Sequence, residues 1–278
     1  MGCPRSGTTL LQSMVAAHTQ VVSFPETHFF SNTLPINPFL RRIKLYGPKS
    51  RTVIREFLDA QGLTEVQPFG EVSDYRFYTH SQWCGKLMDT LDQMVKSASG
   101  KLESGEPVRW GLEKTPRHLY YISSIRQAER SSKFLHMLRE GADVVASMHL
   151  ATKRYPREWN GERSVDECIR WWNDSIRESL KYRDEADHFF VTYGQLTEDP
   201  VSVLKPLCRF LHIDFQQKMI EEFHETAGSL TTEEEKWKAK NSRKSLQKSN
   251  KLEAHFDGQT IAHIREKLLD IDLEEFRH

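Results

Sequence analysis

The sequence predicts an α/β protein with a three-layer, P-loop-like fold, in which helices flank a mostly parallel central sheet. Two observations predict it. First, Gly2-Cys3-Pro4-Arg5-Ser6-Gly7-Thr8-Thr9 opens an apolar helix, with the glycine spacing of a phosphate-binding loop. Second, short apolar runs alternate with longer helical segments along the 278 residues, which is the pattern of parallel strands joined by crossover helices.

The elements follow in chain order. Short apolar runs predict strands at 21–24, 109–113, 133–138 and 188–193. Amphipathic or capped segments predict helices at 10–18, 116–130, 141–153, 164–187, 199–211, 215–225 and 258–270. Residues 31–108 show weak periodicity, and we expect them to form helices and loops inserted over an acceptor site. We interpret 1–278 as a single domain with a possible lid at 226–252.

Composition excludes several classes of protein. Lys+Arg and Asp+Glu both total 39, so no global field attracts the chain to nucleic acid or to an anionic membrane, and any basic site must be local. No apolar run approaches the ~20 residues that a membrane span needs. The four cysteines lack metal-ligand spacing and suggest reduced thiols, so we expect a soluble, cytoplasmic protein. Only Met1 precedes the loop, which suggests that the strand expected before it lies upstream of this sequence.

The loop departs from that of a nucleotide triphosphatase at its eighth residue. Those enzymes carry a lysine there that reaches the β- and γ-phosphates, whereas this chain has Thr8, and its nearby cation is Arg5. Backbone N–H groups at the start of the following helix still favour an anion. The pattern therefore indicates a nucleotide with a different reactive end.

Several blocks together resemble the sulfotransferases that use 3′-phosphoadenosine 5′-phosphosulfate (PAPS), most closely the branch that includes tyrosylprotein sulfotransferases. The blocks that carry this resemblance are residues 4–10, 25–27 (Pro-Glu-Thr), 114–116 (Lys-Thr-Pro), 134–147 and 191–196. Glu26 follows Arg5 by 21 residues, as in that branch, and Arg139 and Ser147 are eight residues apart.

The resemblance implies a role for each matching residue. Arg5, Ser6, Gly7, Thr8 and Thr9 would form the 5′-phosphosulfate loop. The nucleotide's 3′-phosphate and base would be held by Arg139, Ser147 and Tyr193, with Ser242 and Lys248 as lid residues. The catalytic group would consist of Glu26 as general base, with Arg5 and Lys114 stabilising developing charge.

The function predicted is sulfuryl transfer from PAPS to an acceptor hydroxyl on a sugar, a phenol or a peptide tyrosine, without a metal and without a nucleic-acid partner. Sulfotransferases of small phenols carry Lys-Thr-His with histidine as base; here Pro116 takes that place, so the role falls to Glu26, with His28 as a second candidate. Arg41, Arg42, Lys44 and Arg51 could meet an anionic acceptor. Two alternatives stay open: a P-loop kinase of a small metabolite, and a non-catalytic protein that binds a nucleotide or anion.

Overall fold

The structure is a computed structural model that describes the whole chain except residues 68, 70–76, 101–105, 231–250 and 277–278. The chain divides into two compact units. Unit 1 comprises Met1–His18 and Lys133–His278, and unit 2 comprises Thr19–Ser132.

Unit 1 alternates helices with two strands. Its elements are α1 (Thr8–Ala16), β3 (Phe134–Leu138), α7 (Gly141–Arg154), α8 (Val165–Leu180), β4 (His188–Thr192), α9 (Tyr193–Glu198), α10 (Pro200–Leu211), α11 (Lys218–Glu221), α12 (Phe223–Ser229), α13 (Lys251–His255), α14 (Gly258–Lys267) and a 3-10 turn at Leu273–Phe276. Ser164 caps α8 with its side chain, and Glu167 completes a capping box.

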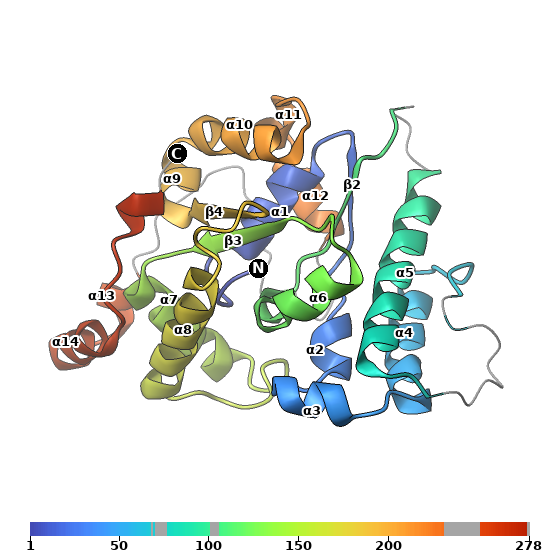
Figure 1. Cartoon of the computed structure of the whole chain (residues 1–278). Helices are drawn as coiled ribbons and strands as arrows, with labels where there is room; N and C mark the ends of the chain where they lie inside the picture. The colour runs from blue at the N-terminus through green and yellow to red at the C-terminus, as the bar shows by residue number, and fades with distance from the viewer. Residues whose placement is uncertain (68, 70–76, 101–105, 231–250, 277–278) are drawn as a thin grey trace. The chain divides into compact units, whose positions relative to one another are not determined.

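The strands of unit 1 run parallel, and all end on the same side. Phe134 pairs with His188 and Leu138 with Thr192 (Figure 1). Met1 and Gly2 also run parallel to β3: Met137 N donates to Met1 O at 2.9 Å, and Gly2 bridges Met137. Because Phe134 and Met137 are an odd number of residues apart, their N–H groups point to opposite edges of β3. Met1–Gly2 and β4 therefore flank β3 on its two edges.

The core of unit 1 forms where α7 and α8 pack together. Val144, Val145 and Met148 on α7 are fully buried with Trp172 on α8 and Ile264 on α14. Met148 follows Val144 and Val145 by four and three residues, so the three share one face of α7, and burial of that face stabilises its packing on α8. The β3–α7 turn, which carries Arg139, is thereby held in place.

Unit 2 is mainly helical. Its elements are β1 (Val21–Ser23), α2 (Phe29–Thr33), α3 (Pro38–Ile43), α4 (Pro48–Ala60), α5 (His80–Ser99), β2 (Trp110–Leu112), a 3-10 helix at Pro116–Tyr121 and α6 (Ile122–Ala128). The two strands pair in parallel, Val21 with Trp110 and Ser23 with Leu112. A second core, rich in aromatic residues, surrounds Trp83, which stacks on Tyr46 and Phe69.

The predicted α/β class with parallel strands is confirmed, and most elements lie where the sequence puts them. Four differ. The helix predicted to residue 187 ends at Leu180, Tyr193 begins α9 instead of ending a strand, and the segment after Pro116 starts as a 3-10 helix. The helix predicted at 215–225 is two short helices, α11 and α12. Within the weakly periodic insert, α5 is a 20-residue helix. No helix in the described ranges is both long enough and apolar enough to cross a bilayer.

Candidate functional site

In unit 1 the glycine-rich loop has the backbone of an anion cradle. Arg5 and Gly7 have left-handed φ values of 74° and 97°, and Ser6 N donates to Cys3 O at 3.2 Å. Gly7 is the N-cap of α1, and no side chain caps that helix. An anion at this helix start would meet backbone N–H groups and the favourable end of the helix dipole.

Ser147, on α7, brings two cations together. Arg5 Nε donates to Ser147 Oγ at 3.2 Å, and Lys251 Nζ donates to the same oxygen at 3.0 Å. The three residues are separated by more than 100 positions in the chain. A hydroxyl shared by a guanidinium and an ammonium group leaves both cations close enough to grip one anion.

Arg139 follows the carboxyl end of β3 and joins this cluster. Its guanidinium lies 4.1 Å from the centre of the Tyr193 ring, and it donates to Arg5 O at 3.3 Å and to Asp143 Oδ2 at 3.0 Å. Burial, and then the charge of Arg139, lowers the pKa of Arg5 to about 10. Two close cations repel in a poorly solvated site, so an anion bound between them would be stabilising.

Two buried polar atoms test whether a phosphorylated nucleotide fits here. Ser6 Oγ in the loop and Arg139 Nε beside Tyr193 have no hydrogen-bond partner among the described residues. Buried polar atoms are rarely left unsatisfied, so both point to a ligand with acceptor oxygens. A nucleotide with one phosphate group at the loop and a second at Arg139 fits these residues.

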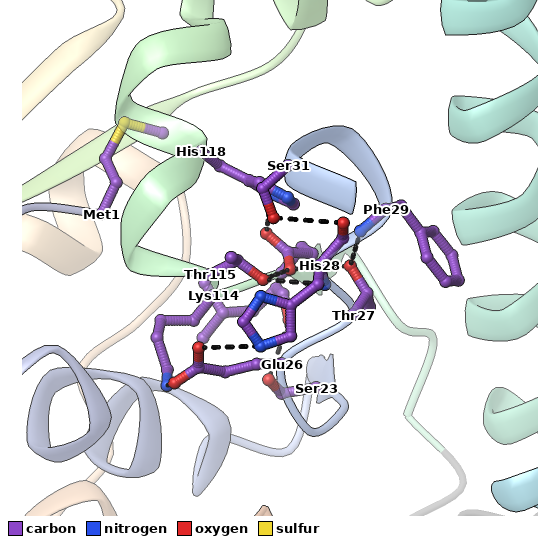
Figure 2. Close-up of polar contacts among 12 residues, drawn as sticks. Met1, Ser23, Glu26, Thr27, His28, Phe29, Ser31, Lys114, Thr115 and His118 are labelled. Atoms are coloured by element: carbon purple, nitrogen blue, oxygen red, sulfur yellow. Dashed lines mark hydrogen bonds and ion pairs between the residues drawn. The ribbon is translucent and has the colours of Figure 1, made fainter. Parts of the chain in front are cut away.

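In unit 2, Glu26 and Lys114 form an ion pair. Lys114 Nζ lies 2.5 Å from Glu26 Oε1, and the side chains are only 6% and 9% exposed, respectively. His28 Nε2 lies 3.4 Å from the other carboxylate oxygen, so Glu26 points between the Lys114 ammonium group and the His28 ring (Figure 2). The β1–β2 pairing creates this contact, because Glu26 and Lys114 each follow the end of one of the two parallel strands.

A second polar network supports this pair. Glu113 accepts hydrogen bonds from Thr27 Oγ1 at 2.9 Å, from Thr115 Oγ1 at 2.7 Å and from His118 Nδ1 at 2.8 Å. Burial alone would raise the pKa of Glu113, but the charge of His118 and the three hydrogen bonds outweigh it and lower the pKa to about 2. Thr115 Oγ1 also accepts from the backbone N–H of His28. Residues 26–28 and 113–115 are therefore tied together.

The structure brings most of the predicted site residues together within their own units. Arg5, Gly7, Arg139, Ser147 and Tyr193 gather in unit 1, with Ser6, Thr8 and Thr9 buried in the same loop and turn. Glu26 and Lys114 meet in unit 2. Ser242 and Lys248 lie outside the described residues. What the sequence analysis missed is Lys251, three positions past the lysine chosen, and the Glu113–His118 pair, whose five-residue spacing in Glu-Lys-Thr-Pro-Arg-His was its available signal.

The expectation for the basic residues of the insert needs correction. Arg41 and Arg51 are 3% and 4% exposed, so they do not face solvent, whereas Arg42 and Lys44 are exposed. Among the residues that the structure describes, no group of three His, Cys, Asp or Glu side chains could hold a metal ion.

Comparison with known proteins defines the class to which these features belong. A sequence model of the sulfotransferase family matches residues 1–217. The chain therefore belongs to the sulfotransferase family. It is 26% identical over 234 residues to protein-tyrosine sulfotransferase 1 of Danio rerio, and 26% identical over 235 residues to the Homo sapiens protein of that name. These matches take in 83% of this chain but 57% and 55% of those proteins, so the chain spans a little over half of their length.

Among solved structures, the chain is similar to the sulfotransferase domain of the olefin synthase from Synechococcus PCC 7002. That similarity has 18% identity and a TM-score of 0.49, and covers 98% of this chain and 88% of the other. The sulfotransferase domain of the curacin biosynthetic pathway gives 16% identity, a TM-score of 0.48 and coverage of 98% and 91%.

Proposed function

We propose that this protein transfers a sulfuryl group from PAPS to the hydroxyl of an acceptor. One observation carries the proposal: Arg5 and Lys251 meet on Ser147, and Arg139 bonds to Arg5 O, beside a glycine loop that opens a helix with no side-chain cap. A nucleotide with phosphate groups at two separate positions needs two separate cationic grips. Membership of the sulfotransferase family supports the same donor.

The residues of unit 1 hold and orient the donor. The loop N–H groups and Ser6, Thr8 and Thr9 bind the phosphosulfate end, and Arg139 and Ser147 bind the 3′-phosphate. The Tyr193 ring packs on the Arg139 guanidinium and so fixes the plane of that group. When bound, PAPS supplies an activated sulfuryl group on a phosphate leaving group. Arg5 then balances the charge that grows on the leaving oxygen.

The residues of unit 2 act on the acceptor. Glu26 accepts the proton of the attacking hydroxyl, and Lys114 stabilises negative charge on the transferred group. In the resting protein the two form an ion pair at 2.5 Å, so an acceptor that enters meets a base and a cation already side by side. His28, which is 41% exposed, contacts the other oxygen of Glu26 and orients it.

The acceptor class is the next part of the proposal. The similar proteins named protein-tyrosine sulfotransferase make a tyrosine-containing peptide the first acceptor to try. Simple phenols and sugars, which present the same hydroxyl nucleophile, are the comparison set.

Calorimetric titration tests the donor directly. The protein should bind 3′-phosphoadenosine 5′-phosphate more tightly than ATP or adenosine 5′-phosphosulfate, because only the first carries the 3′-phosphate that Arg139 is proposed to grip. Preference for ATP would favour the kinase alternative, although Thr8 stands where a kinase loop has lysine. Tight binding of the 3′-phosphorylated nucleotide without sulfation of any acceptor would favour a non-catalytic binding protein.

A further inference from the structure

Around helix α3 in unit 2 the usual distribution of side chains is reversed: an arginine is buried, and large apolar side chains are exposed to solvent. Within the described residues, the large apolar side chains that are exposed are Ile36 at 50%, Phe39 at 68%, Leu40 at 45%, Ile43 at 61%, Leu45 at 59% and Phe77 at 62%. Five of these six fall within ten positions of the sequence.

These side chains form one patch. Ile43 follows Phe39 and Leu40 by four and three residues in α3, so the three share one face of the helix, and Ile36 and Leu45 flank it on either side. Phe77 lies beside this face, because the neighbouring residue Tyr78 forms an isolated β-bridge with Tyr46 and the Phe77 ring packs directly on Gly47. Together they cover on the order of a few hundred Å², the size of patch that marks interaction surfaces.

Arg41 fixes this orientation of the helix. Its guanidinium donates to Pro35 O at 2.6 Å, to Ile36 O at 2.7 Å and to Tyr120 O at 2.7 Å, and lies 4.2 Å from the centre of the Tyr121 ring. Tyr46 Oη in turn donates to Arg41 O at 3.1 Å. A well-bonded buried arginine holds the helix in one rotation, so exposure of the apolar face is built into the fold.

The charged residues of the chain segment that carries α3 have one sign. Between Glu26 and Glu56 the sequence contains six lysines and arginines and no acidic residue. Arg41 and Arg51 are buried, and Arg42, Lys44 and Lys49 are exposed at or near the patch. Because the whole chain carries no net charge, this segment is a local cationic area on an otherwise balanced protein.

We infer that the α3 patch, defined as Ile36, Phe39, Leu40, Ile43, Leu45 and Phe77 with Arg42, Lys44 and Lys49, docks the protein on an anionic lipid surface. Aromatic and aliphatic side chains enter the boundary between headgroups and acyl chains, and the basic side chains contact anionic headgroups. Charge complementarity selects this partner: large exposed apolar residues beside the exposed cations Arg42, Lys44 and Lys49 match a surface that is apolar below and negative above.

Vesicle co-sedimentation tests the inference with the intact protein. Vesicles of phosphatidylcholine with about one-third phosphatidylglycerol should bind the protein at least about tenfold more tightly than pure phosphatidylcholine. Phe39→Ser with Ile43→Ser should lose most of this binding, and Phe39→Leu with Ile43→Leu, which keeps the apolar area, should retain it. All are exposed positions, so thermal unfolding should stay close to that of the wild type.

Charge reversal tests whether Arg42 and Lys44 in the patch cause the preference for anionic vesicles, or whether any loss of positive charge has the same effect. Arg42→Glu with Lys44→Glu should abolish the preference for anionic vesicles. Lys96→Glu with Arg130→Glu makes the same charge change at exposed positions of α5 and the end of α6 in unit 2, and should leave it intact. Failure of the wild type to bind anionic vesicles, or equal loss in both charge-reversal pairs, would overturn the inference. So would a dimer in sedimentation velocity that Phe39→Ser with Ile43→Ser dissociates, because the patch would then be a surface between two copies of this chain.

Discussion

Lys114 Nζ lies 2.5 Å from Glu26 Oε1, although the two residues are 88 positions apart in the chain. The contact depends on parallel pairing of two three-residue strands, Val21–Ser23 and Trp110–Leu112, whose ends deliver one charge each. A carboxylate and an ammonium group are thus brought together by a short piece of sheet inside a mainly helical unit.

The ion pair makes Glu26 the sharpest test of the chemistry. Glu26→Gln keeps the shape of the side chain but removes its capacity to accept a proton, so kcat should fall by about 10²- to 10⁴-fold. The affinity for 3′-phosphoadenosine 5′-phosphate should change little. Glu56→Gln, at an exposed position on α4, is the matched control and should leave turnover intact. Unchanged turnover in a folded Glu26→Gln protein would exclude Glu26 as the base.

Arg139 should decide how the nucleotide is selected. Arg139→Ala should weaken binding of 3′-phosphoadenosine 5′-phosphate by about 10- to 100-fold, the worth of a charge-assisted hydrogen bond, and binding of adenosine 5′-phosphate much less. Arg177→Ala is the control, because Arg177 also pairs with an aspartate on a helix but is 58% exposed. Equal losses for both nucleotides in calorimetry would mean that Arg139 acts structurally, through its bond to Arg5 O.

Lys251 should contribute to the same grip. Lys251→Met keeps much of the side-chain volume and removes the ammonium group that donates to Ser147 Oγ, so nucleotide affinity should fall, most strongly at low salt. Lys251→Arg restores a cation and should recover part of the affinity. If the methionine variant bound the nucleotide as the wild type does at every salt concentration, Lys251 would have no part in the site.

Gly7 should be irreplaceable because of its backbone and its neighbour. Its φ is 97°, and a Cβ there would lie 2.5 Å from Cδ2 of Tyr193, so Gly7→Ala both strains the loop and displaces the ring beside Arg139. We expect a lower melting temperature and a loss of nucleotide binding. Gly85→Ala, inside α5 with open space around it, should instead stabilise the protein by roughly 0.5–1 kcal/mol. Retained binding in Gly7→Ala would contradict the proposed cradle.

Glu113 should govern stability in acid. Its pKa is lowered from 4.5 to about 2 in the folded protein, so its ionised form stabilises the fold above the unfolded-state value. That contribution, about 3 kcal/mol at most, is present above pH 4.5 and is lost as the pH falls towards 2. Glu113→Gln should lower the free energy of unfolding at pH 7 and flatten its dependence between these values. Denaturant titrations at several pH values would measure it; a parallel pH dependence in wild type and variant would refute this account.

Local sequence patterns were sufficient for much of the molecule. The Gly2–Thr9 spacing predicted both the loop and the start of α1, and apolar runs placed β3 and β4 within one residue of their observed bounds. Tyr193 shows the limit of such patterns. An aromatic after a strand reads as more strand, but Thr192 caps the next helix by accepting from Gln195 N, so the strand ends one residue earlier.

Contacts between distant residues needed the structure. The sequence analysis chose Lys248, and only the folding of α13 against α7 shows that Lys251 reaches Ser147. The Glu113–His118 pair was missed for a related reason, because it forms through a 3-10 turn at Pro116, where an ordinary helix was expected.

The sequence by itself determined the class of fold and the glycine-rich loop that opens α1, because each depends on backbone preferences and side-chain chemistry within a few neighbouring residues. The tertiary structure alone decided which charges meet and which surfaces stay exposed. The segment 38–43 shows why: Arg41, predicted from the sequence to be available to an anionic acceptor, is buried, and one of the carbonyl groups that it contacts belongs to Tyr120, 79 residues away. Burial of a charge depends on partners that no local pattern contains.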